Sequence, residues 1–294
     1  MSAVPCSEYL QERLVKEGVA DFHRLETEYL FDLVVVNTSP LHVGSGRGGE
    51  ALGSAVDLSV VIGSAVVETD GGSIVYRGPV IPGSSLKGVL RSLAESIAIG
   101  LEKAVFEVEL PGAGKPLRCT GESLSELESW LSKTRCSGEA LKAVDNYFEK
   151  CFASPVVRLF GAPWLGSHLT VYDAYPVDGR RPPTRVVTRV AIDRLTGSQS
   201  PGKLYTMEIV DAGVEWRMRM KLVNIDPFGD TDEARLLRTL LSMLAEGVSI
   251  GRRTSAGHGL LRLLVDRSRV YVYRVDPEKG LTREEKPLEK LLKG

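Results

Sequence analysis

The chain has 294 residues, enough to bury a substantial core in one or two domains, and its hydrophobic (43%) and charged (26%) fractions are those of an ordinary globular protein. A net charge of −1 argues against a freely acting nucleic-acid binder, which is usually basic overall. The apolar runs are too short to cross a bilayer and acidic residues interrupt the first 28 positions, so we expect a cytoplasmic protein with no membrane partner.

The first third of the chain predicts a helix, a strand, a loop, a strand and a second helix. Residues 7–28 are an acidic helical segment, and residues 29–37 are β-branched and apolar, which predicts a buried strand. A glycine-rich loop follows, and residues 55–68 return to strand character. The clearest helix covers 81–99, where Leu86, Val89, Leu90, Leu93, Ala94 and Ile97 share one face and Ser84 or Ser85 can cap the start.

The middle of the chain predicts an insertion and a long hairpin. Residues 103–150 begin with a Gly/Pro segment and continue as two short helical stretches, 122–132 and 138–150. Residues 155–175 predict loop and strand, and 184–211 predict two strands joined by a tip rich in glycine, serine and proline.

The last third predicts a strand, a helix and a second glycine loop. Apolar and charged residues alternate over 213–222, and leucines recur at helical spacing over 231–246. A glycine loop at 251–259 and a strand at 260–265 follow, and the charged last twenty residues predict a peripheral tail. The whole order predicts an α+β fold of the ferredoxin-like kind.

The first glycine loop matches GxGxxG over residues 44–49, the pattern of a dinucleotide-binding turn. Strand residues, not a helix, follow its third glycine, so the context of a dinucleotide site is missing. A flexible surface loop stays an open alternative. Glycines also let a backbone approach a polyanion closely and direct its N–H groups toward it, which favours a phosphate-binding role.

Basic residues support the same role. Lys87 and Arg91 lie within two turns of a helix start, where unpaired N–H groups attract phosphates, and Arg252 and Arg253 lie in the second glycine loop. The hairpin region carries five more: Arg180, Arg181, Arg185, Arg189 and Arg194. Each cluster alone is typical of a solvated face, but several beside glycine loops indicate binding to a nucleic-acid backbone.

Two further residues are candidates for chemistry on RNA, although spacing alone does not select either. His42 stands at the mouth of the first loop and is otherwise a structural histidine. Asp57 follows that loop and is either a turn residue, a metal ligand or a base that aids the 2′-hydroxyl.

Side-chain amides are scarce, as in proteins that work at high temperature. The four cysteines contain no CxxC pair, and three interpretations stay open: buried thiols, a disulfide, or a zinc site formed by Cys119, Cys136, Cys151 and His168.

A set of segments, in this order, resembles the RAMP (repeat-associated mysterious protein) superfamily, and most of all the backbone subunit of type III CRISPR effector complexes. The segments are LHVGSG (41–46), GSAVD (53–57), IPGSSLKGVLRS (81–92), RLFG (158–161), TRVAIDRLTG (188–197) and IGRRTSAGHG (250–259). The second glycine loop departs from the usual pattern, because Arg252, Arg253 and Thr254 occupy part of it.

The resemblance implies a modified RNA-recognition-motif-like sheet with a helical insertion and a protruding β-hairpin thumb. It implies one RAMP domain over 1–275, with core segments at about 29–100 and 155–265, an insertion at about 103–150, a thumb at about 184–211 and a tail at 276–294.

The implied partners are guide CRISPR RNA, target RNA, copies of the chain itself and other effector subunits. Asp57 matches the aspartate that cuts target RNA with a divalent metal, Mg or Mn, and no organic cofactor is implied. The residues expected to bind RNA are His42, Gly44, Gly46, Ser84, Ser85, Lys87, Arg91, Arg185, Arg189, Arg194, Arg252, Arg253 and Gly257. A backbone subunit that does not cut, and a stand-alone RAMP endoribonuclease that processes guide RNA through a histidine, are the alternatives.

Overall fold

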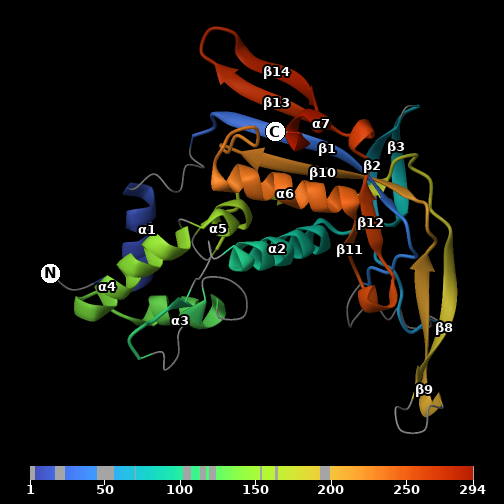
Figure 1. Ribbon diagram of the computed structural model, residues 1–294, viewed down its shortest axis with the longest axis horizontal. Helices are drawn as coiled ribbons and strands as arrows, with labels where there is room; N and C mark the ends of the chain where they lie inside the picture. The colour runs from blue at the N-terminus through green and yellow to red at the C-terminus, as the bar shows by residue number, and fades with distance from the viewer. Residues whose placement is uncertain are drawn as a thin grey trace.

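The computed structural model of the protein describes residues 4–16, 24–44, 56–69, 71–101, 107–112, 117–118, 124–152, 154–162, 165–192 and 199–293. Within these residues, helices cover one face of an antiparallel sheet, and hairpins and a helical lobe extend from it (Figure 1). No helix in this part of the chain is long and apolar enough to span a membrane. Gly46, Arg194 and Cys119 lie outside the described residues, so their predicted roles stay predictions.

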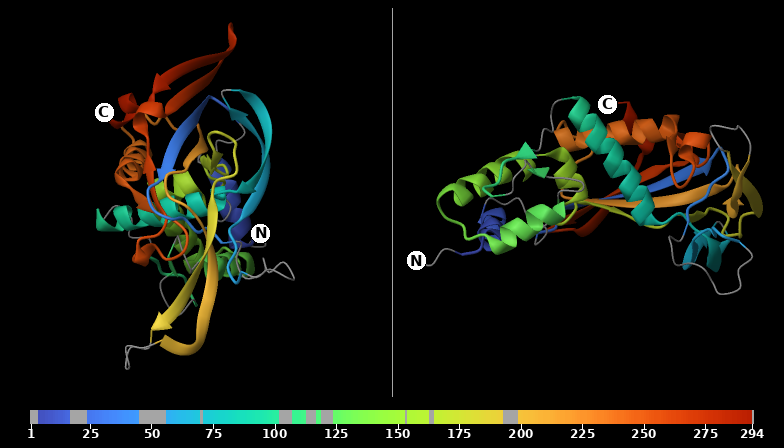
Figure 2. Two further views of the ribbon diagram at one scale, coloured as in Figure 1. Left: turned by 90° about the vertical axis from the view of Figure 1, so that its right-hand side faces the viewer. Right: turned by 90° about the horizontal axis from the view of Figure 1, so that it is seen from below.

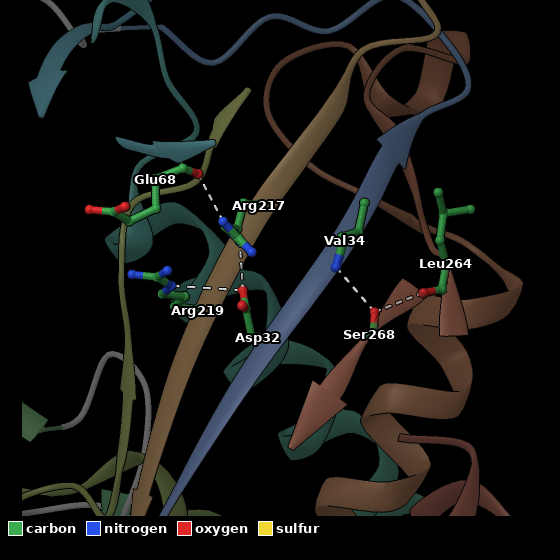
Figure 3. A network of polar contacts seen from close by, with 7 residues as sticks. All are labelled: Asp32, Val34, Glu68, Arg217, Arg219, Leu264 and Ser268. Atoms are coloured by element: carbon green, nitrogen blue, oxygen red, sulfur yellow. Dashed lines mark hydrogen bonds and ion pairs between the residues drawn. The ribbon is translucent and has the colours of Figure 1, made fainter. Parts of the chain in front are cut away.

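The sheet is built around β1, the predicted buried strand, which pairs along both of its edges. Its strands in the described ranges are β1 (Thr27–Asn37), β6 (Leu169–Val171), β7 (Tyr175–Pro176), β10 (Glu215–Val223), β11 (Val248–Ser249), β12 (Leu260–Leu263), β13 (Arg269–Asp276) and β14 (Gly280–Pro287). β10 pairs antiparallel along one edge of β1, and β13 and then β12 pair along the other. Where β1 changes partner, the Val34 N–H donates to the Ser268 hydroxyl at 3.1 Å, which donates to the Leu264 carbonyl at 2.7 Å (Figure 3).

The helix-covered face of the sheet holds the main core. The strict alternation of β10 buries Trp216, Met218, Met220 and Leu222 against α2 (Gly83–Gly100), α5 (Pro155–Phe160) and α6 (Asp232–Glu246) (Figures 1 and 2). α6 begins after Thr231, whose hydroxyl accepts the Ala234 N–H at 3.3 Å. The predicted α+β, ferredoxin-like fold is confirmed, although residues 155–160 form a helix and not the expected loop.

Two hairpins flank one end of the sheet. β2 (Ile62–Thr69) pairs with β3 (Gly72–Pro79), and β8 (Thr184–Ile192) pairs with β9 (Gln199–Val210). The β8–β9 hairpin extends well away from the sheet in both views (Figures 1 and 2). It is the long hairpin that the sequence predicts, and we call it the thumb.

A helical lobe lies at the opposite end of the molecule from the thumb (Figure 1). It contains α1 (Cys6–Lys16), α3 (Leu124–Lys133), α4 (Gly138–Tyr147) and η2 (Phe148–Phe152), with the short pair β4 (Glu107–Val108) and β5 (Leu117–Arg118). Leu10 and Leu14 of α1 join Leu131 and Tyr147 in a separate apolar core. The N-terminal helix is therefore part of the lobe that the insertion forms, a contact that the sequence pattern does not reveal.

The C-terminal residues differ from the expected peripheral tail. β14 continues the sheet as the partner of β13, and α7 (Leu288–Leu292) buries Leu288 and Leu291 in the main core. The charges of β14 point to solvent and dominate the composition, whereas two leucines one turn apart provide the contact. The charged composition predicts an exposed tail, and the leucine pair explains why the segment is packed instead.

Candidate RNA-binding and cleavage site at the thumb root

The segments on either side of the first glycine loop, the second glycine loop and the thumb meet at the end of the sheet. Leu41 exchanges backbone hydrogen bonds with Val210 of β9, at 2.9 and 2.8 Å, so the first loop starts against the thumb root. Further along, the Leu58 N–H donates to the Thr206 carbonyl at 3.1 Å, and the Glu208 N–H donates to the Leu58 carbonyl at 2.9 Å. A single parallel β-bridge between Leu58 and Met207 thus holds the segment that carries Asp57 against β9, which fixes its position relative to the thumb.

Asp57 is exposed, and Thr206 holds its carboxylate in place. Oδ2 accepts the Thr206 N–H at 2.6 Å and the Thr206 hydroxyl at 2.9 Å, and that hydroxyl accepts the Asp57 N–H at 3.0 Å. The backbone and then the side-chain hydrogen bond from Thr206 lower the pKa of Asp57 below its usual value. Among the described residues, Oδ1 has no hydrogen-bond partner. The site therefore presents an ionised, oriented carboxylate with one oxygen toward solvent.

His42 lies under the two loops and is fully buried. Its Nδ1 donates to the Glu208 carbonyl at 2.6 Å, and burial is the main cause that lowers its pKa. Nε2 is buried and unpartnered in the described structure, and a Cβ on Gly44 would lie only 2.9 Å from it. In this arrangement the histidine supports the loops from inside, and Gly44 leaves room for its ring.

The second glycine loop packs directly on the residues that lead into the first. The Arg252 N–H donates to the His42 carbonyl at 3.0 Å, and the Gly259 N–H donates to the Pro40 carbonyl at 2.8 Å. Gly251 and Gly259 have positive φ values of 86° and 76°, and a Cβ on either would collide with a backbone carbonyl oxygen. Glycine is required at these two positions because the loops cross backbone against backbone.

Basic side chains gather where the second loop meets the thumb. Arg189 of β8 donates to Nε2 of the buried His258 at 3.1 Å, and Arg253 donates to the Tyr205 hydroxyl with its guanidinium over the ring. Arg185 pairs with Asp211 at 2.7 Å. Burial, followed by the charges of Arg189 and Arg253, lowers the pKa of His258, so this histidine is neutral near pH 7. The structure therefore brings the thumb and second-loop arginines together beside the Asp57 segment.

The comparison with known families agrees with this geometry. The model of the RAMP superfamily matches residues 35–262, which include both glycine loops, α2 and the thumb. The chain belongs to the RAMP superfamily. This membership makes it a CRISPR-associated RNA-binding protein. No curated protein matches the chain.

The start of α2 in this RAMP protein differs from the prediction. Pro82 is the N-cap, and neither Ser84 nor Ser85 makes a capping hydrogen bond. Instead, the Asp173 carboxylate accepts the Gly83 N–H at 2.8 Å, which places a negative charge where an RNA phosphate was expected. An aspartate ninety residues away replaces the serine caps, and local sequence cannot show such a contact.

The two basic residues of α2 have protein partners. Lys87 donates to the Ser167 hydroxyl at 2.6 Å, and Arg91 pairs with Glu95 at 2.9 Å. Burial and then the neighbouring Arg91 lower the pKa of Lys87. Both side chains are partly buried, as is Arg189 of the thumb, whereas Arg185, Arg252 and Arg253 are exposed.

The face of the sheet away from the helices carries a polar network (Figure 3). Asp32 of β1 accepts Arg217 at 2.9 Å and lies 3.7 Å from Arg219, and Arg217 also donates to the Glu68 carbonyl of β2 at 2.9 Å. These bonds tie the β2–β3 hairpin to the sheet and leave a groove of about 420 Å³ beside it. The cations of this face are largely paired with carboxylates within the protein.

The cysteines show a pairing that the sequence analysis did not consider. The thiols of Cys6 and Cys136 hydrogen-bond to each other inside the helical lobe, and burial raises the pKa of both. His168 instead bonds the Val223 carbonyl through Nδ1, at 2.8 Å. The described residues contain no group of three His, Cys, Asp or Glu side chains that could hold a metal, although Cys119 and the Cys151 side chain lie outside them.

Proposed function

We propose that this RAMP protein is the backbone subunit of a type III CRISPR effector complex, that copies of it assemble along guide RNA, and that it cuts paired target RNA at Asp57. One observation carries the proposal: the Asp57 carboxylate is fixed by Thr206 at the root of a thumb that carries Arg185 and Arg189. Because like charges repel, a carboxylate at this place weakens the binding of RNA phosphates, and a role in the chemistry would explain why it is there.

The lowered pKa of Asp57 favours one of its two possible roles. A carboxylate with a depressed pKa is a weak proton acceptor, so general-base catalysis is poorly supported. An ionised oxygen facing solvent suits a hard cation, and Mg²⁺ or Mn²⁺ often binds through one or two carboxylates together with water and phosphate oxygens. The carboxylate therefore fits the expected divalent metal, which would stabilise charge on the reacting phosphate. The role of the chain itself is to hold Oδ1 toward the 2′-hydroxyl and the adjacent phosphate.

The structure argues against the alternative of a stand-alone ribonuclease that uses a loop histidine. His42 is fully buried with Nδ1 bound to a carbonyl, and His258 is buried against Arg189. Neither ring is exposed where a bound RNA would need a proton donor or acceptor.

The test compares cleavage and binding in the assembled complex. Asp57→Ala should lower the rate of metal-dependent target cleavage by roughly 10²–10⁴-fold or more and leave guide binding nearly unchanged. Asp276→Ala is the matched control, because Asp276 is only partly buried and its pKa is also lowered by backbone hydrogen bonds.

If the Asp57→Ala variant cuts target RNA at the wild-type rate, Asp57 is not the catalytic residue. If the wild-type protein binds RNA but does not cut with any divalent metal, the non-catalytic backbone subunit replaces the proposed role.

A further inference from the structure

A pocket of about 800 Å³ lies at the base of the thumb, and Arg180 and Arg181 are the residues of the basic hairpin cluster that line it. Its walls come from the β2–β3 turn, the 176–183 segment, the β9–β10 turn and Arg267. Its volume is within the range of about 300–1,000 Å³ that is usual for small-molecule sites. Prolines and valines form much of the lining, and three arginines and two carboxylates stand among them. Glu215 is paired with Arg267, and Asp178 accepts the Arg180 backbone N–H at 3.0 Å.

The backbone of the 176–183 segment is held firmly. The Val177 N–H donates to the Glu215 carbonyl at 3.0 Å, and the Asp211 N–H donates to the Pro183 carbonyl at 3.1 Å. Between these anchors, Gly179 has a φ of +64° and lies tightly against Ile74 of β3. The pocket wall is therefore preformed, which lowers the entropy cost of binding a ligand.

Two arginines of this segment are exposed and unpaired. Within the described residues, the guanidinium groups of Arg180 and Arg181 make no ion pair or hydrogen bond. By contrast, Arg267 in the same pocket donates to both carboxylate oxygens of Glu215 at 2.6 Å. Arg180 and Arg181 are thus available to an anionic ligand. Arg267 and Glu215 neutralise each other, so neither adds a net charge to the pocket.

These cations continue the basic surface of the thumb. β8 begins at Thr184, directly after the pocket, and Arg185 and Arg189 share one face of that strand because they are four residues apart. They are separated by roughly 13 Å along the strand. A row of cations from the pocket to the second loop fits an extended polyanion with evenly spaced charges better than an acidic peptide.

We propose that the pocket binds one nucleotide of single-stranded RNA as the strand leaves the thumb root. The guanidinium forks of Arg180 and Arg181 hold its phosphodiester, since the planar fork matches phosphate oxygens. The proline and valine wall receives the sugar and base by apolar contact, without sequence readout. This inference rests on the proposed RNA-binding function and extends the bound strand beyond it.

The test is the salt dependence of single-stranded RNA binding by Arg180→Ala/Arg181→Ala. Each neutralised phosphate contributes about −0.7 to the slope of log K against log salt, so losing the one phosphate that both arginines hold should make the slope shallower by about 0.7. Lys133→Ala/Arg135→Ala removes two exposed charges from the helical lobe and should leave the slope unchanged. RNA containing 4-thiouridine should also crosslink to the 176–183 segment of the wild-type protein.

The outcomes separate the two proposals. An unchanged slope in Arg180→Ala/Arg181→Ala, with RNA binding intact, overturns the pocket assignment and leaves the RNA-binding proposal standing. Loss of binding to a partner subunit, with the RNA slope unchanged, also overturns it and makes the pocket a protein-docking site. A wild-type protein that does not bind single-stranded RNA refutes both.

Discussion

Asn37 connects the sheet to the thumb root, and its removal should be among the costlier changes in the protein. The side chain is fully buried at the end of β1. Its Nδ2 donates to the carbonyls of Ser39 at 3.0 Å and Asp211 at 2.8 Å. Its Oδ1 accepts the Val214 N–H at 3.2 Å and the Trp216 indole N–H at 3.0 Å. Four bonds thus join the first loop, the thumb base and β10.

The expected magnitude for Asn37→Ala follows from the groups left behind. A buried donor without a partner costs about 1–3 kcal/mol. The Trp216 indole is fully buried and incurs that cost, whereas the partly exposed Val214 can reach water more easily. We expect a loss of about 2–5 kcal/mol in the free energy of unfolding, together with faster hydrogen exchange at the thumb base.

Urea denaturation measures this loss, and a double-mutant cycle isolates its cause. In a Trp216→Phe background the indole N–H is absent, so Asn37→Ala should cost about 1–3 kcal/mol less. If Asn37→Ala costs the same in both backgrounds, the indole bond is not what stabilises the junction. A cost below about 0.5 kcal/mol would refute the reasoning altogether.

Three further predictions test the loops and the C-terminus. Gly259→Ala should distort the second loop, because its Cβ would meet the Ile250 carbonyl, and weaken RNA binding in a filter-binding assay; unchanged binding would show that the loop adapts. Burial lowers the pKa of His42 and His258 below 6.5, so the unfolded chain binds protons at a higher pH than the folded one. The melting temperature should therefore be highest above about pH 6.5 and decrease as the pH falls below it. A melting temperature that does not change with pH would contradict this. Leu291→Ala should cost about 2–5 kcal/mol in urea denaturation, whereas a peripheral tail would show no loss.

Periodicity predicts the elements whose partners are close in sequence or whose pattern is strong. The alternation of β10, the leucine face of α6 and the thumb strands were all predicted from the residues alone. Elements that depend on distant contacts were not. α1 joins the helical lobe, and β14 with α7 completes the sheet and core, through side chains whose local composition is charged.

The candidate site shows the same division. Family resemblance selected Asp57, and the clustering of basic residues selected the thumb arginines. The structure places Asp57 against Thr206 beside them. His258 and Tyr205 were not predicted as site residues. His258 stands between two glycines, a pattern that indicates close packing of the backbone around it. Only the fold shows that it receives Arg189. Conversely, a histidine at a loop mouth suggested an exposed group, while backbone packing buries His42.

The central claim is that copies of this RAMP protein assemble side by side on guide RNA. Electron microscopy and native mass measurement of the purified protein with guide RNAs of increasing length test it most directly. The account predicts filaments in which the number of bound copies rises in proportion to RNA length. A single copy bound to every RNA, whatever its length, would contradict it.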